Sequence, residues 1–154
     1  MVESHEQTKR AAGDNRNIQG IRGWLIFPAL GLIIGPIIGA IGLVSALGMY
    51  ADVARAGYGI VYMLELLVLM GLLLLTIYAA LQFFRQKKST AKVMIALYSI
   101  SLATSLVLLL VELSVGPEDF VEESGKQLVR DIVAAAIWIP YFNVSKRVKA
   151  TFVN

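Results

Sequence analysis

The chain has 154 residues, of which 57% are hydrophobic and only 16% are charged, and its formal net charge is +3. Its mean hydropathy is +0.70, whereas an average soluble domain carries about a quarter charged residues, so an ordinary water-soluble domain is excluded. The absence of cysteine excludes disulfides, thiolate zinc sites and iron–sulfur clusters.

Four apolar segments follow a polar stretch at residues 1–22, which we expect to be a disordered cytoplasmic tail. About 20 apolar residues are needed to cross a hydrocarbon core of roughly 30 Å. None of the segments shows the period-two alternation of a transmembrane barrel strand. The fourth segment is marginal, because its apolar run covers only the 17 residues from Leu128 to Val144. We therefore predict helices near residues 24–49, 60–84, 91–115 and 126–145.

Short connections make successive helices antiparallel neighbours. The predicted fold class is therefore all-α, an integral-membrane, up-down-up-down four-helix transmembrane bundle over residues 23–145. We expect residues 116–127 to form an acidic, solvated loop and residues 146–154 to form a basic cytoplasmic tail. Eleven of the 14 lysines and arginines flank one face of this bundle and three flank the other. This bias predicts that both termini are cytoplasmic, and it explains the net charge without a nucleic acid partner.

The first apolar segment carries Gly31, Gly35 and Gly39 at four-residue spacing. Such spacing lets another helix backbone approach closely. The glycines form a helix-packing face. This face contacts either another helix of the same bundle or a docked partner, which is a second protein or a second copy of the chain. Pro36 in this segment and Pro140 in the last one each remove a backbone hydrogen bond, so we expect a kink at both positions.

Three acids and one base lie inside or at the edge of the apolar segments, namely Glu65, Glu112, Arg130 and Asp131. At 1.5 Å per residue, Glu65 lies about 9 Å and Glu112 about 5 Å from the outer face. The other two lie roughly 7–9 Å from it. A charge in the apolar region costs about 2.5–3.5 kcal/mol even on a lenient scale, so these groups should face protein or water. We predict an intramembrane polar cluster near the outer face.

Arg130 is the only base within reach of these three acids, and two interpretations stay open. In the structural one, Arg130 binds one or two carboxylates and fixes the second and third helices against the fourth. In the functional one, the acids left without a permanent partner bind protons or cations. Ser101 and Ser105 share a helix face with Glu112, which extends the polar surface along the bundle interior.

Catalytic motifs are missing from the sequence. The single histidine, His5, lies in the polar N-terminal stretch, and no phosphate-binding loop, dinucleotide fingerprint or zinc motif occurs. We therefore expect no catalytic residues, no cofactor and no metal site, and we do not expect an enzyme.

Two stretches carry a family resemblance: residues 20–36 read GIRGWLIFPALGLIIGP, and residues 137–153 read IWIPYFNVSKRVKATFV. Together they resemble the bacterial membrane-protein family called domain of unknown function 2569, over roughly residues 19–154. Members open with Gly-x-x-Gly-Trp-Leu and close with Trp-x-Pro-Tyr-Phe and Ser-Lys-Arg-Val-Lys. Arg22 stands where a glycine is expected, and Asn143 where an apolar residue is expected. The resemblance implies a four-helix fold in the bacterial inner membrane and no assigned activity.

The leading interpretation is a non-catalytic accessory, scaffold or assembly subunit of a membrane complex. The alternative is a small proton- or cation-coupled transporter or channel that uses the outer-leaflet carboxylates. The expected partners are the lipid bilayer and, through the first helix, another membrane protein or a second copy of the chain.

Overall fold

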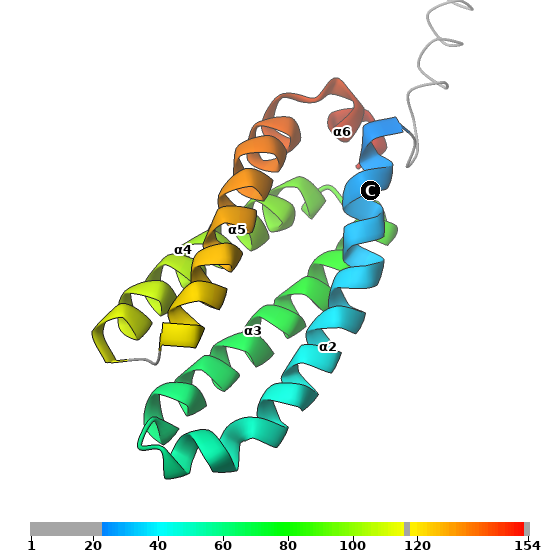
Figure 1. Cartoon of the computed structure of the whole chain (residues 1–154). Coiled ribbons are helices and arrows are strands. Elements are labelled where there is room, and N and C mark those ends of the chain that lie inside the picture. The colour runs from blue at the N-terminus through cyan, green and yellow to red at the C-terminus, as the bar shows by residue number, and fades with distance from the viewer. Residues whose placement is uncertain (1–22, 116–117, 153–154) are drawn as a thin grey trace, which may run out of the picture.

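The computed structural model describes residues 23–115 and 118–152 (Figure 1). The described elements are η1 (Gly23–Leu25), α2 (Ile26–Arg55), α3 (Gly59–Phe84), α4 (Thr90–Val115), α5 (Glu118–Val144) and α6 (Lys146–Thr151). No strand occurs within the described ranges. The prediction of an all-α bundle of four long helices is confirmed. The tail expected at residues 1–22 lies outside the described residues.

Three helical segments are long and apolar enough to cross a membrane: Gly23–Arg55, Gly59–Phe84 and Thr90–Val115. Many of their large apolar side chains are exposed on the surface of the bundle. Soluble monomers rarely expose large contiguous apolar patches, so such a surface on helices of this length indicates contact with lipid. The chain is therefore a membrane protein. Helix α5 is not among these segments, because charged residues fill its first turns.

The four long helices form two antiparallel hairpins (Figure 1). Helix α2 packs along α3, α4 packs along α5, and the two hairpins meet through α3 and α4. Helices α2 and α5 are therefore the outer helices of the arrangement. Pro36 and Pro140 lie inside α2 and α5, which are each assigned as one helix across the proline.

The main hydrophobic core lies at the end of the bundle that carries α6, which we call the α6 end. It joins Leu25 before α2, Phe83 near the end of α3 and Met94 near the start of α4, all fully buried. The ring of Phe152 meets the ring of Phe83 edge-on, with centroids 5.2 Å apart. Residues from both ends of the described chain thus complete one core.

The segment after residue 145 was expected only as a basic tail, but Lys146–Thr151 forms the helix α6. Val148 and Phe152 are four residues apart and share one helix face. Both are buried against the core, whereas Lys146 and Lys149 are exposed. The basic residues gave the segment its polar appearance, and its two apolar residues fix its position.

The opposite end of the bundle, which we call the loop end, holds a smaller core between α2 and α3. The hydroxyl of Tyr62 donates to the backbone oxygen of Ala46 at 3.1 Å, and its ring stacks on Phe120 of α5 with centroids 5.9 Å apart. Helix α5 begins at Glu118, well before the expected start near residue 126. The expected loop at residues 116–127 is therefore wrong, because acidic residues are favourable in the first turns of a helix and extend α5 backwards.

Candidate functional site

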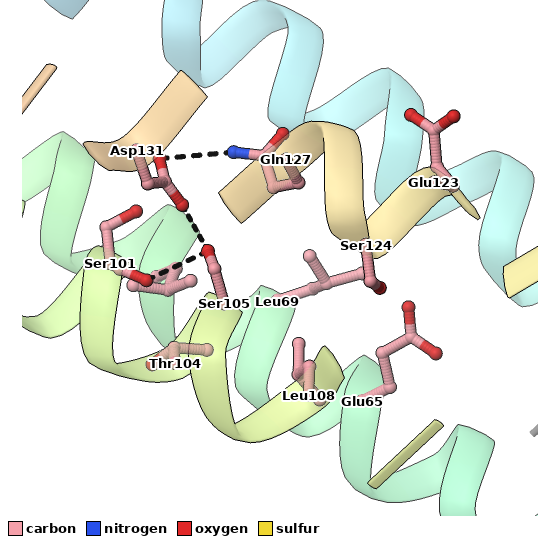
Figure 2. Close-up of a pocket in the computed structure, with 11 residues that line it drawn as sticks. Glu65, Leu69, Ser101, Thr104, Ser105, Leu108, Glu123, Ser124, Gln127 and Asp131 are labelled. Carbon is pink, nitrogen blue, oxygen red and sulfur yellow. Dashed lines mark hydrogen bonds between the residues drawn. The ribbon is translucent and has the colours of Figure 1, made fainter. Parts of the chain in front are cut away.

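A polar cavity of about 290 Å³ lies between α3, α4 and α5 (Figure 2). A second cavity of about 170 Å³ shares Glu65, Glu123 and Ser124 with the first and extends toward Met49 of α2. The two cavities therefore form one polar region, in the half of the bundle away from α6. Three helices supply its polar side chains, so the site exists only in the folded bundle.

A hydrogen-bonded group on α4 and α5 lines the part of the larger cavity farthest from the loop end (Figure 2). The hydroxyl of Ser105, only 6% exposed, bonds to the carboxylate of Asp131. It also lies 3.0 Å from the backbone oxygen of Ser101. The side-chain amide of Gln127, one turn before Asp131, donates to the second carboxylate oxygen at 3.2 Å. These bonds hold Asp131 against α4.

Asp131 lies deeper than the sequence indicated. The expected depth of roughly 7–9 Å assumed a helix that begins near residue 126, whereas α5 begins at Glu118, so Asp131 follows about 20 Å along the helix. Its partner Ser105 lies about 15 Å before the end of α4 at Val115. The polar lining therefore runs from the loop end to near the middle of the 26-residue helix α4.

Glu65 of α3 and Glu112 of α4 lie nearer the loop end, where the two cavities meet. Glu112 is only 4% exposed, and its Oε2 atom has no hydrogen-bond partner. The hydroxyl of Ser124 on α5 is close enough to interact with the Glu112 carboxyl. The carboxyl groups of Glu65 and Glu112 are close enough to interact electrostatically. Two acids thus face a shared space in which the electrostatic interaction between them is weakly screened.

Arg130 does not join these acids. Its side chain is exposed and lines neither cavity. Successive residues on a helix are about 100° apart, so the rotation that points Asp131 at α4 turns its neighbour outward. Within the described ranges, the ion pairs are Arg55–Asp52 at 2.8 Å and Lys126–Glu122 at 2.6 Å, all four side chains being exposed. The predicted contact between Arg130 and the acids is therefore wrong.

The Lys126–Glu122 pair lies on α5 before its apolar run begins. The ammonium of Lys126 donates a hydrogen bond to the Glu122 carboxylate, which lowers the pKa of Glu122 and raises the pKa of Lys126. Both side chains are solvated, so the pair is a surface feature. In the described part of the chain, no three acidic, histidine or cysteine side chains are spaced to hold a metal ion.

The three glycines of the expected packing face have different surroundings. A Cβ atom added at Gly39 would lie 3.2 Å from the side chain of Leu73, and one at Gly35 would lie 3.8 Å from Thr76. Both glycines therefore face α3 of the same bundle. A Cβ atom at Gly31 would meet nothing within 4 Å. Gly35 and Gly39 thus support packing within the bundle, whereas Gly31 faces open space.

Sequence reasoning did not single out Glu123, Ser124 and Gln127, because they fell in the expected loop. A signal for them exists: Glu123, Gln127 and Asp131 follow one another at four-residue spacing, which places them on one helix face. Read as a helix from residue 118, the segment shows a polar face that can only turn toward water or toward a polar partner.

The comparisons with known proteins identify a family. No curated protein and no solved structure is similar enough to the chain to give a match. Residues 18–153 match the family described as a protein of unknown function, DUF2569. This match covers most of the chain and includes all four long helices. The chain therefore belongs to the DUF2569 family.

Proposed function

We propose that the protein is a small, non-catalytic, multi-pass protein of the bacterial inner membrane that works as a proton- or cation-coupled transporter or channel. The observation that supports it is the convergence of Glu65, Glu112 and Asp131 on one polar region. Among the residues that the structure describes, no lysine or arginine side chain lines either cavity. Glu123 also lines both cavities. Four acids that share a space without a fixed positive partner are suited to take up and release a positive charge.

The position of these acids supports the same function. Ionisable groups within membrane helices are costly, and they are usually directed at water-filled cavities or ion pathways. A volume of about 290 Å³ has room for roughly ten water molecules at about 30 Å³ each. Water can therefore accompany an ion from the loop end to Asp131 of α5, which lies beside Ser105 near the middle of α4.

The distribution of positive charge supports an orientation. Lysines and arginines gather at the α6 end, in the α3–α4 connection and in α6 itself. We place this end, and with it both termini, in the cytoplasm according to the positive-inside rule. The cavities then lie in the half of the bundle nearer the outer side of the membrane, which is the side from which ions would enter.

Proteoliposomes with an internal pH-sensitive dye test the proposal. A potassium diffusion potential set by valinomycin should drive a proton flux in the wild type, and Glu65→Gln and Glu112→Gln should abolish it. Glu122→Gln is the matched control, because Glu122 is exposed and lies outside both cavities. Circular dichroism checks that each variant is folded. A wild-type flux no greater than that of empty liposomes, or an equal flux in both cavity variants, contradicts the proposal.

A second candidate function is that of an accessory or assembly subunit. Helix α2 is an outer helix of the bundle, and Gly31 and Gly42 leave open space on it. A neighbouring transmembrane helix could approach closely there. In this case Gly31→Leu should remove a partner that co-purifies in mild detergent, while the bundle itself stays folded. A wild type that purifies alone as a monomer contradicts this candidate.

A further inference from the structure

The cavity lining combines acids with apolar and aromatic side chains. Leucines from α3 and α4 line the larger cavity together with the polar groups, namely Leu69, Leu72 and Leu108. The smaller cavity is lined by Met49 and by the stacked rings of Tyr62 and Phe120. A site built for a bare inorganic cation would instead surround it with closely spaced oxygen atoms. The lining is therefore suited to a ligand with a charged part and an apolar part.

The spacing of the acids agrees with this distinction. The described acids nowhere gather in a group of three that could hold a metal ion. A compact metal ion would contact at most one or two of the acids that line the cavities, whereas a ligand several atoms long can reach from one carboxylate to the next. The cavity of about 290 Å³ lies just below the usual range for small-molecule sites, about 300–1,000 Å³, and so admits only a small ligand.

Glu112 gives independent evidence that the site recognises a positive group. Its side chain is only 4% exposed, it lines the smaller cavity, and its Oε2 atom has no hydrogen-bond partner. Buried polar atoms in folded proteins nearly always have a partner. An ammonium or guanidinium group has several N–H donors to offer and no acceptors, so it complements an unpaired carboxylate oxygen.

The aromatic pair lies on the same cavity. Tyr62 and Phe120 come from α3 and α5, and Glu65 and Glu112 line the cavity beside them. Aromatic faces attract organic cations, and the attraction strengthens where water is excluded. Carboxylates and aromatic rings in one small space are thus a combination that recognises a positive nitrogen attached to an apolar group.

We propose that this site, whose role in ion coupling is the function proposed above, binds a small organic monocation: an amine or guanidinium group on an apolar body. The positive nitrogen lies between Glu65 and Glu112, and the apolar body extends along the leucines toward Ser105 and Asp131. The stacked rings of Tyr62 and Phe120 border the nitrogen.

Isothermal titration of the protein in lipid nanodiscs tests this assignment, with empty nanodiscs subtracted. Benzylammonium chloride is the probe, and benzyl alcohol and potassium chloride are the comparison compounds. Benzylammonium should bind saturably, whereas benzyl alcohol and potassium should show no saturable heat. This comparison needs only the wild-type protein, so it does not depend on the folding of any variant. Equal binding of benzylammonium and benzyl alcohol, or no binding of either, overturns the assignment.

Variants then locate the site. Glu65→Gln and Glu112→Gln should each weaken benzylammonium binding at least about tenfold, as expected for a lost charged hydrogen bond. Phe120→Leu should weaken it by about 2- to 30-fold, the range of a cation–π contact. Glu122→Gln should leave it unchanged. Unaltered binding in both cavity variants overturns the assignment.

The assignment and the proposed transport function can fail separately. Proton flux that depends on Glu65 and Glu112, without benzylammonium binding, supports the transport function and overturns the organic-cation assignment. Benzylammonium binding that depends on both glutamates, without any flux, supports the assignment and contradicts transport.

Discussion

Replacing Gly39 with leucine should destabilise the bundle, whereas the same change at Gly31 should not. A Cβ atom at Gly39 would already lie 3.2 Å from the Cδ1 atom of Leu73 on α3, so the larger leucine side chain has to push the Leu73 side chain aside or move the two helices apart. Overpacking of this kind costs about 1–3 kcal/mol. At Gly31 nothing lies within 4 Å, and removing a glycine from a helix interior gains up to about 1 kcal/mol. The two variants should therefore differ by about 1–4 kcal/mol in free energy of unfolding.

Unfolding by sodium dodecyl sulfate in mixed micelles, followed by circular dichroism, measures this difference. Gly39→Ala is the graded control, because its single methyl group meets only the flexible end of Leu73, and it should lie close to the wild type. Equal stability of the two leucine variants, or a less stable Gly31→Leu, would refute the conclusion that Gly39 sets the approach of α2 to α3.

Three further predictions concern contacts outside the cavity lining or at its edge. Tyr62→Phe removes the hydrogen bond to the Ala46 oxygen and should cost about 1 kcal/mol in the same unfolding assay, so an unchanged stability contradicts a role for this bond. Phe152→Ala removes a buried ring from the α6 end and should speed tryptic cleavage within α6; cleavage at the wild-type rate would show that the ring does not hold this helix. Glu122→Gln should lower stability only at neutral pH. Pairing with Lys126 lowers the pKa of Glu122. The stability that the pair adds is therefore present above the ordinary carboxyl pKa, and it disappears as the pH falls through the lowered pKa of Glu122. A stability difference between wild type and variant that grows on acidification would contradict this expectation.

The three most apolar helices could be located from sequence because their positions follow from desolvation alone. Helices α3 and α4 begin and end within one residue of the expected bounds 60–84 and 91–115, whereas α2 continues to Arg55, beyond the expected end at residue 49. Helix α5 could not be located in this way, because its first turns are charged and amphipathic. Its start at Glu118 follows from its acidic first turns and from the packing of Phe120 on Tyr62, which hydropathy does not report.

The candidate site was only partly predictable from sequence, because tertiary packing decides which face of α5 turns inward. Spacing along α4 placed Ser101, Ser105 and Glu112 on one face. The two serines line the larger cavity, and Glu112 lines the smaller one. Neighbouring residues on α5 pose a harder problem, since Arg130 and Asp131 lie equally close in sequence to the other acids. The rotation of α5 about its own axis decides which of them faces the interior, and tertiary packing sets that rotation.

The joining of Leu25 and Val148 in one core has a consequence for biogenesis. These residues are more than 100 positions apart, and a ribosome that adds about 5–20 residues per second separates their emergence by roughly 6–25 s. During this interval α2 is already available to the insertion machinery, but the hydrophobic core at the α6 end, which contains Leu25, is still incomplete. A chain truncated just before α6 should thus keep its four long helices but lack Val148 and Phe152, the last apolar side chains of this core.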